Sequence, residues 1–553
     1  MKLKPTQLFL AFLGVLFLFN LLQSTFTELL FDEAYYWYYA REMAWGYFDH
    51  PPMVALLVKI SSFLFNGELG VRFMSCVLSA ATLGVLWKTI EHPGKNAYIP
   101  HFFALVFSMT LLNAYGFFTL PDTPLLFFTA LFLLLYKHFL QKETLITALG
   151  LGLVMAALMY SKYHAVLVIL FIVLSNLKLV FSWRAWVAVV LAVLLYVPHL
   201  LWLYSHDFVS IKYHLFERPN RAYEFNDFTL GYFVNLIALF GLTFPWIYLA
   251  LFKTKARDLF TRSLLFLVYG VLLFFFISSF QRRVQTQWII VICIPLVIIV
   301  FRYLTDHPGH RKCLMRAALV NAAVLLLLRV GLVYEPLFPI AFETHGNKKW
   351  VSAIEKEAGD APVIFENSYR AAPMYSFYSG HPSYSLNNVY YRENQYNIDG
   401  SESEFQHKRI LLISRRFRDG DMSYNNIDGE LQYGKFIPDF ESYRELECRV
   451  EPWEGKAEGQ LLNLSVYNPY TDDIPLTKLK FAVAFLNAYK QVKEVKQVEI
   501  QKKNGKAVNL RAMDTTYLQF VMPHSKTKDP VYFRMSVSDN GLYWGINGNN
   551  TKL

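Results

Sequence analysis

Long apolar stretches separated by short polar segments recur through roughly the first 335 residues, and a more polar pattern follows. The apolar runs are roughly 18 to 22 residues long, the length that an α-helix needs to cross about 30 Å of hydrocarbon. The pattern therefore predicts an α-helical polytopic membrane protein with about eleven transmembrane helices. The expected spans lie near residues 7–26, 70–87, 98–118, 123–140, 144–160, 163–180, 185–204, 229–252, 262–280, 288–303 and 317–334.

Basic residues gather in alternate loops between the predicted spans. The positive-inside rule places such loops in the cytoplasm, and with them the N-terminus. An odd number of spans then puts the C-terminal region on the other side of the membrane. We therefore expect a multi-pass protein of a bacterial inner membrane with a periplasmic tail. The basic set comprises Lys2, Lys4, Lys88, Lys95, Lys137, Lys142, Lys178, Arg184, Lys253, Lys255, Arg257, Arg302, Arg311, Lys312 and Arg316.

The tail shows two different patterns of its own. Residues 341–445 alternate helix and strand signals, with an apolar strand from Pro362 to Glu366 and another from Arg409 to Ser414. Residues 446–553 alternate apolar and polar positions, which is typical of a β-sandwich. We therefore predict three domains: a transmembrane domain over 1–340, an extracytoplasmic α/β domain over 341–445 and a β-sandwich-like domain over 446–553.

Composition agrees with a membrane location and narrows the function. Only 17% of the residues are charged and 54% are hydrophobic, whereas about a quarter of a soluble domain is charged. The net charge of +10 is explained by basic cytoplasmic loops, so we expect no nucleic-acid partner. The chain contains no Walker loop, dinucleotide fingerprint or HExxH motif, so ATP, NAD and zinc-protease chemistry lack support.

The first candidate site is FDEAYYWYYAREMAWGYFDHPP, residues 31–52. Asp32 and Glu33 follow directly on the first span, where a carboxylate is costly unless it faces water, a metal or a partner. They are our first catalytic candidates. The alternative is an ordinary aromatic belt at the membrane surface with solvated acids.

A second acid, Asp122, lies in the segment LPDTP between two predicted spans. Asp122 could simply cap the following helix. By the predicted topology it lies on the same outer face as Asp32, and two converging acids suit a general base or a metal site. We therefore expect Asp122 as a catalytic residue, with a Mg²⁺ or Mn²⁺ ion between Asp32 and Asp122 as a further option and no other cofactor.

Cations on that outer face run against the positive-inside bias. Arg and Lys pair with phosphate oxygens, so a lipid-linked phosphate would explain the group. Lys162, in the segment YSKYH between two tight spans, is the most informative member. The alternative is that single members bind lipid headgroups. Our phosphate-binding candidates are Lys162, Arg218, Arg221, Arg282, His50 and Lys59, and Arg72, Lys212 and Arg283 also lie on this face.

Several segments in the same order resemble the C-type (GT-C) membrane glycosyltransferases. They are residues 32–52, LPDTPLLFF, YSKYHAVL, VSIKYHLFER and ENSYRAAPMYSFYSGHPSYSLNN. The branch with the lipid A aminoarabinose transferase is the most similar, together with the related dolichyl-phosphate-mannose protein mannosyltransferases. The likeness covers roughly residues 8–400. His50 stands where the aminoarabinose branch has a lysine.

The resemblance implies an inverting transfer of a sugar from a polyprenyl-phosphate donor on the outer face. Asp32 and Asp122 would be the two acids, while Lys162 and Arg218 or Arg221 would hold the donor phosphate. The acceptor would be a lipid, such as lipid A, a glycan or a protein. Two other functions fit the same residues: a transporter or flippase of lipid-linked glycans, and a lipid-binding scaffold whose tail recruits partners.

Overall fold

The computed structural model describes residues 3–338, 340–455, 457–502, 509–528 and 530–553; Lys2 of the predicted cytoplasmic set lies outside them. The chain forms two compact units. The helical unit comprises Met1–Ser205 and Tyr223–His345, and the second unit comprises His206–Ala222 and Gly346–Leu553. The segment 206–222, which the hydropathy pattern presented as a loop between spans, therefore folds with the distant tail.

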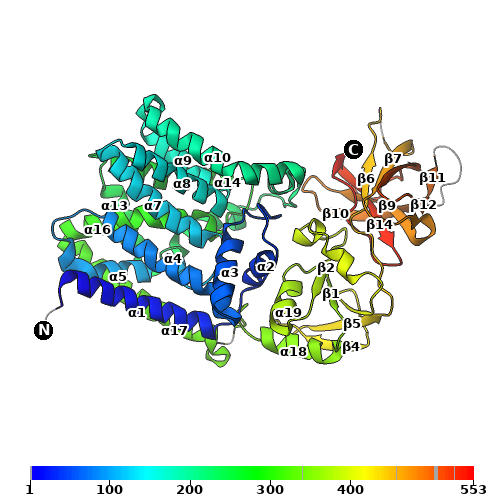
Figure 1. Ribbon diagram of the computed structural model, residues 1–553, viewed down its shortest axis with the longest axis horizontal. Helices are drawn as coiled ribbons and strands as arrows, with labels where there is room; N and C mark the ends of the chain where they lie inside the picture. The colour runs from blue at the N-terminus through cyan, green and yellow to red at the C-terminus, as the bar shows by residue number, and fades with distance from the viewer. Residues whose placement is uncertain (1–2, 339, 456, 503–508, 529) are drawn as a thin grey trace. The chain divides into compact units, whose positions relative to one another are not determined.

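Every predicted span coincides with helical structure in the helical unit (Figure 1). Within the described residues, seven helices, with Thr286–Asp306 counted as one, are long and apolar enough to cross a membrane, and three shorter ones are also apolar. The helices are α1 (Pro5–Phe26), α2 (Phe31–Arg41), α3 (Met53–Leu64), α4 (Gly67–Thr89), α5 (Ile99–Ser108), α6 (Thr110–Ala114), α7 (Asp122–Gln141), α8 (Leu145–Ser161), α9 (Ala165–Ser175), α10 (Trp183–Ser205), α12 (Gly231–Ala238), α13 (Phe244–Lys253), α14 (Leu259–Ser278), α15 (Thr286–Ile289), α16 (Cys293–Asp306) and α17 (Pro308–Val333).

The predicted span 229–252 is not one straight helix. Asn226–Ala238 and Gly241–Lys253 meet at an angle of 93°. Gly241 takes the left-handed conformation at φ +54°, and a Cβ there would lie 2.5 Å from Asn321 Oδ1. Only glycine fits such a position without strain, so the break follows from the packing of Asn321, which hydropathy does not report.

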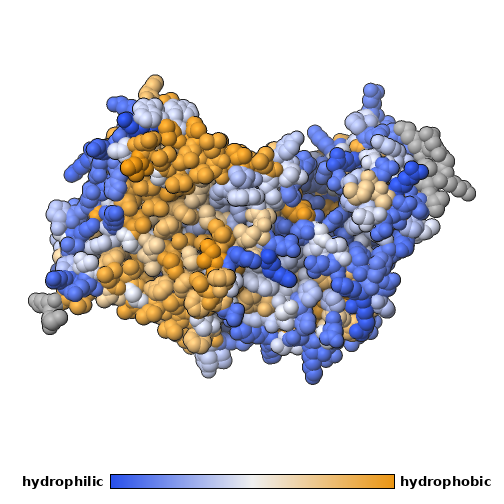
Figure 2. All heavy atoms as spheres, in the orientation of Figure 1, coloured by the Kyte–Doolittle hydropathy of each residue, from blue (hydrophilic) through white to orange (hydrophobic). Residues whose placement is uncertain are grey.

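Hydrophobic side chains occupy both the interior and the surface of the helical unit. Its main core takes side chains from α5, α7, α14 and α16. Large apolar residues are exposed along the outer helices, for example Val15 at 67%, Phe63 at 90% and Leu194 at 62%. Figure 2 shows hydrophobic residues over much of the visible face of this unit and hydrophilic residues over the second unit. A surface of this kind is stable in lipid, so the chain is a multi-pass membrane protein.

The second unit begins with an α/β region. Its five-stranded sheet has the order β2-β1-β3-β5-β4. Strands β1, β2 and β3 are parallel, and β5 and β4 extend the sheet in antiparallel fashion. The elements are α18 (Asn347–Ala358), β1 (Val363–Glu366), α19 (Ala371–Ser379), β2 (Ser383–Leu386), β3 (Ile410–Ser414), β4 (Met422–Asn425) and β5 (Leu431–Ile437).

Two four-stranded antiparallel sheets follow, with the orders β10-β9-β14-β15 and β11-β13-β7-β6. Alternate side chains of both sheets, among them Leu464, Phe485 and Phe520, share one buried core. This is a β-sandwich. Its strands are β6 (Glu447–Val450), β7 (Leu461–Asn468), β8 (Ile474–Pro475), β9 (Leu479–Leu486), β10 (Val492–Val498), β11 (Ile500–Lys502), β12 (Asn509–Leu510), β13 (Asp514–Val521), β14 (Tyr532–Asp539) and β15 (Thr551–Lys552).

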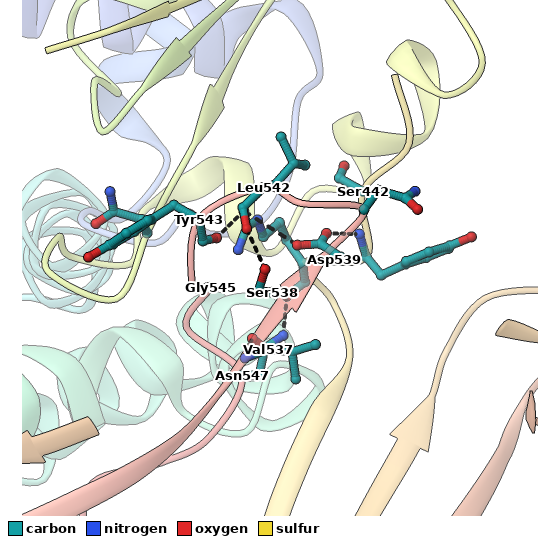
Figure 3. A network of polar contacts seen from close by, with 12 residues as sticks. Ser442, Val537, Ser538, Asp539, Leu542, Tyr543, Gly545 and Asn547 are labelled. Carbon is teal, nitrogen blue, oxygen red and sulfur yellow. Dashed lines mark hydrogen bonds and ion pairs between the residues drawn. The ribbon is translucent and has the colours of Figure 1, made fainter. Parts of the chain in front are cut away.

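Buried polar contacts join the α/β region to the sandwich (Figure 3). Asp539, at the end of β14, pairs with Arg444 at 3.5 Å, and Arg444 donates to the Tyr543 carbonyl oxygen at 2.7 Å. The Glu402 carboxylate, from the α/β region, accepts from Ser442 Oγ at 2.6 Å and from the Arg444 backbone N–H at 2.9 Å. The two parts of the tail are thus one folded body. The predicted fold class, a helical membrane domain with an α/β and β-sandwich tail, is confirmed.

Candidate functional site

A buried ion pair in the helical unit joins two of the predicted site residues. Asp122 is the first residue of α7, and Lys162 lies in the short turn between α8 and α9. Lys162 Nζ donates to Asp122 Oδ1 at 2.7 Å and to Oδ2 at 2.8 Å. Their side chains are 7% and 4% exposed. Residues 40 positions apart in the sequence therefore meet in a low-dielectric site, where their charges act strongly on one another.

The two charged groups of this pair bond to little else. Within the described part of the chain, no other residue hydrogen-bonds the Asp122 carboxylate or the Lys162 ammonium. An ammonium has three donors and a carboxylate about four lone-pair positions. The pair therefore keeps unused hydrogen-bonding capacity, which a ligand could take up.

Asp32 approaches the same site from the first turn of α2. Its side chain is exposed in the first turn of this helix. The buried phenol of Tyr115 lies within electrostatic range of both Asp32 and Asp122. The structure thus brings the two predicted acids near one tyrosine that the sequence patterns had not singled out.

The aromatic segment after Asp32 forms an ordered cluster. Tyr35 Oη donates to Asp49 Oδ2 at 3.3 Å, and the rings of Tyr39 and Tyr47 stack with centroids 4.2 Å apart. The His50 ring lies edge-on to Tyr36 at 5.7 Å. This packing fixes the FDHPP motif beside α2. A plain aromatic belt would not need a buried Asp49 within the cluster.

Glu33, the third predicted catalytic acid, is engaged elsewhere. Its carboxylate accepts from Arg72 Nε at 2.8 Å and Nη2 at 2.5 Å, and from the backbone N–H groups of Thr119 at 2.8 Å and Leu30 at 3.0 Å. Both charged side chains are fully buried. All of the usual acceptor positions of Glu33 are thus filled from within the protein. We interpret Glu33 as a residue that holds α2 and the Thr119 segment in place.

His199 is a further polar residue that the sequence patterns missed. It lies in α10 and is fully buried. Its Nδ1 lies 2.7 Å from the Trp45 carbonyl oxygen, and its Nε2 lies 3.2 Å from Tyr163 Oη. His199 therefore connects the first long loop to the turn that carries Lys162. A histidine in an apolar span is by itself a functional signal, and that signal could have identified it.

Lys59 and Arg282 do not belong to the buried Asp122–Lys162 pair. Lys59 lies on the exposed side of α3 beside exposed Leu56 and Ile60, while the opposite side of that helix is buried. At this position Lys59 is better placed to bind a lipid headgroup than to join the buried Asp122–Lys162 pair. Headgroup binding was the alternative that the sequence left open for single cations. Arg282 is half-buried in the segment between α14 and α15.

Arg218 and Arg221 belong to the second unit, in the segment 206–222. The tail holds this segment by its backbone: the Asn220 N–H donates to the Tyr489 carbonyl oxygen at 3.0 Å. Gln491 Nε2 in turn donates to the Asn220 carbonyl oxygen at 3.0 Å. The sandwich therefore fixes the backbone beside both arginines.

Side chains add to this attachment. The guanidinium of Arg392 lies 4.9 Å from the Tyr213 ring of the segment and 4.8 Å from the Tyr369 ring of the α/β region. Burial and, to a smaller extent, the nearby Glu217 raise the pKa of Glu393 to about 7. A carboxyl group with such a pKa titrates near neutral pH, so the attachment includes a proton-sensitive contact.

The metal option does not fit the residues. Within the described ranges, no group of three or more His, Cys, Asp or Glu side chains could hold an ion. Asp122 already has the Lys162 ammonium at 2.7 Å, and a divalent cation would have to displace it. We therefore assign no step to a metal ion.

Comparison with known proteins gives matches that cover the site. The family described as "Dolichyl-phosphate-mannose-protein mannosyltransferase" matches residues 49–202, which include His50, Lys59, Asp122 and Lys162. A lipid A galacturonosyltransferase of Rhizobium johnstonii is 25% identical over 196 residues. That match covers 34% of this chain and 41% of the relative. The chain therefore spans about two fifths of the length of this relative.

Two solved structures share the fold. The structure titled ArnT from Cupriavidus metallidurans in the apo state matches with a TM-score of 0.56 and 12% identity. The same protein bound to undecaprenyl phosphate matches with a TM-score of 0.54 and 13% identity. Each match covers 74% of this chain and 92% of that protein. Together with the family match, these likenesses confirm the resemblance that the sequence motifs predicted.

Proposed function

We propose that this chain, which shares the fold of ArnT and is similar to dolichyl-phosphate-mannose-protein mannosyltransferases and to a lipid A galacturonosyltransferase, is a lipid-linked-sugar glycosyltransferase of the GT-C type. It would move a sugar from a polyprenyl-phosphate donor to an acceptor at the outer face of a bacterial inner membrane. The N-terminus would be cytoplasmic and the tail periplasmic. The observation that carries the proposal is the buried Asp122–Lys162 pair, with its spare hydrogen-bonding capacity and Asp32 close by.

Lys162 is the proposed partner of the donor phosphate. When the bond between the sugar C1 and the phosphate oxygen breaks, negative charge grows on the phosphate. A preplaced ammonium in a site of low dielectric stabilises that charge without reorganisation. Asp122 holds the Lys162 Nζ in place through two hydrogen bonds of 2.7 and 2.8 Å, and Lys162 has a third donor for the phosphate.

Asp32 is the proposed general base. Because Asp32 is exposed at the start of α2, an acceptor hydroxyl can reach it. The acceptor oxygen attacks C1 from the face opposite the phosphate, so configuration inverts, and Asp32 takes the hydroxyl proton. General-base help of this kind is worth about 10²–10⁴-fold in rate.

The remaining predicted cations have supporting roles in the proposal. Arg282 and His50 would line the approach of the donor phosphate, and Arg218 and Arg221, in the segment 206–222 of the second unit, stay predicted phosphate-binding residues. Lys59 would bind headgroups at the membrane surface. The galacturonosyltransferase relative supports lipid A or a similar lipid as the acceptor, ahead of a glycan or a protein.

The test compares strains that lack the gene and carry either the native protein or Asp32→Asn. Mass spectrometry of lipid A and polyprenyl-phosphate intermediates should show the sugar modification with the native protein and its loss with Asp32→Asn. Glu42→Gln is the matched control, because Glu42 is an exposed acid at the end of α2. Full modification with Asp32→Asn would refute the proposed role of Asp32.

A transporter or flippase is the alternative function. Purified protein in proteoliposomes with a lipid-linked sugar and an acceptor separates the two. A transferase releases free polyprenyl phosphate only when acceptor is present. A flippase moves the intact lipid to the other leaflet and releases none.

A further inference from the structure

A further buried cation lies in the helical unit, beside a small cavity. Arg329, near the end of α17, is only 3% exposed. Its guanidinium donates from Nε to Asn113 Oδ1 at 2.8 Å, from Nη1 to Asn20 Oδ1 at 2.9 Å and from Nη2 to the Asn113 carbonyl oxygen at 2.9 Å. Charged groups inside membrane domains are costly, and they are functional candidates for that reason.

Arg329 differs from Arg72 in how its charge is balanced. Arg72 has the Glu33 carboxylate, whereas within the described ranges Arg329 contacts only neutral groups. The rings of Phe117 and Phe19 lie 4.4 and 4.7 Å from its guanidinium carbon. Amide oxygens and aromatic faces attract a cation, but they leave the site with a net positive charge.

The cavity beside Arg329 is lined by polar and apolar side chains in similar numbers, and Arg329 is the charged residue among those that line it. Its volume is about 20 Å³, and Asn20, Ser79, Tyr115 and Gly116 line it with Arg329. The guanidinium has five N–H groups, of which the bonds above account for three. Among the described residues, the Asn20 amide nitrogen and the Ser79 hydroxyl have no other hydrogen-bond partner. Arg329, Asn20 and Ser79 thus bring a positive charge and unused donors to one small cavity, and these groups can bind an anion.

The size of the cavity limits the ligand. One water-sized sphere needs roughly 10–15 Å³, so the cavity takes a monatomic ion and excludes a phosphate ester or a lipid tail. Gly116 keeps this space open, because a Cβ there would lie 2.9 Å from Asn20 Nδ2 and 3.3 Å from Ser79 Oγ.

We propose that this cavity binds a small monovalent inorganic anion such as chloride. The anion balances the charge of Arg329 and accepts hydrogen bonds from the side chains of α1, α4 and α17. Tyr115, which lies within electrostatic range of Asp32 and Asp122, lines the same cavity. The anion therefore stabilises the packing of α1, α4 and α17 around this cavity. This inference does not depend on the identity of the sugar or the acceptor.

The experiment uses the purified full-length protein in detergent. Thermal unfolding is measured in sodium gluconate, with chloride or bromide replacing gluconate at constant ionic strength. We expect halide to raise the unfolding midpoint in a saturable way. Crystals grown in bromide should show one anomalous peak beside the Arg329 guanidinium. An unfolding midpoint that is the same in gluconate and in halide would overturn the proposal, as would bromide crystals without that peak.

Variants locate the effect. Arg329→Gln should abolish the halide dependence. Ser79→Ala removes one donor without removing charge, and should weaken the apparent halide affinity roughly tenfold, because a hydrogen bond to an ion is lost. Ser278→Ala is the matched control, since the Ser278 hydroxyl donates to the Phe274 carbonyl oxygen of its own helix, α14, and to no other described residue. If Ser79→Ala responds to halide as the native protein does, the proposed site is wrong even if Arg329→Gln fails to fold.

Discussion

Two buried ion pairs of the helical unit, Glu33–Arg72 and Asp122–Lys162, have the same kind of chemistry but opposite surroundings. Glu33 accepts two hydrogen bonds from Arg72 and two from backbone N–H groups. Arg72 also donates to the carbonyl oxygens of Ser24, Thr27 and Glu28. Asp122 and Lys162, in contrast, hydrogen-bond only each other through their charged groups in the described part of the chain.

The difference separates a structural pair from a candidate reactive pair. A pair whose donors and acceptors are all used ties several backbone segments together and has nothing left for a ligand. A pair with unused donors and acceptors can be held ready for a substrate, because the substrate supplies the missing partners. Burial alone does not distinguish them, since both pairs are almost fully buried.

The largest expected effect comes from breaking the saturated pair. Glu33→Gln leaves the Arg72 charge buried without its carboxylate, which costs about 3–5 kcal/mol of stability. We expect a lower thermal unfolding midpoint and a smaller monodisperse fraction in size-exclusion chromatography. Glu42→Gln, at an exposed position, is the control. Native-like stability of Glu33→Gln would show that the saturated pair is not structural.

Neutralising the other pair should separate stability from transfer. The double variant Asp122→Asn with Lys162→Gln removes both charges together, so no uncompensated charge is left and stability should change little. Loss of the preplaced ammonium should lower sugar transfer by about 10²–10³-fold. Unfolding curves and transfer assays measure the two effects, with Lys142→Gln as an exposed control. Wild-type transfer by the double variant would contradict the proposed role.

A smaller, pH-dependent effect is expected where the tail holds the segment 206–222. The pKa of Glu393 rises from 4.5 to about 7, first through burial and then through Glu217. The folded state therefore binds this proton more tightly than the unfolded state, and stability falls as the pH rises from about 4.5 to 7. Arg534 and Arg392 also face Glu393 and offset part of the repulsion.

Hydrogen exchange of residues 206–222 tests this contact. Exchange corrected for its intrinsic pH dependence should be slower at pH 5.5 than at pH 8, and Glu393→Gln should remove that difference. Equal protection of the native protein at both pH values would argue against it.

Removal of divalent cations should have the smallest effect. Since the Asp122 carboxylate already forms an ion pair with the Lys162 ammonium, we expect a chelator such as EDTA to leave the rate of sugar transfer unchanged. Transfer assays before and after chelation, with Mg²⁺ and Mn²⁺ added back, measure this. A loss on chelation that either ion restores would show that a metal does enter the site.

The site was only partly predictable from the sequence. Asp32, Asp122 and Lys162 could be selected as candidates because each places a charge at the edge of an apolar span, which is costly and therefore informative. The same reasoning selected Glu33, whose partner Arg72 lies 39 residues away. No local pattern shows that the two side chains meet, so the structural role of Glu33 emerged only from the fold.

The order of apolar and polar positions by itself determined the helical spans and the change to a strand-rich tail, because hydropathy and period are local properties. Only the tertiary structure decided that 206–222 folds with the tail, that a span breaks at Gly241 and that Arg329 has no carboxylate among its described contacts. Each of these three features depends on contacts between residues that are far apart in the sequence. Such contacts are set by how the folded elements pack, and no local sequence pattern reports them.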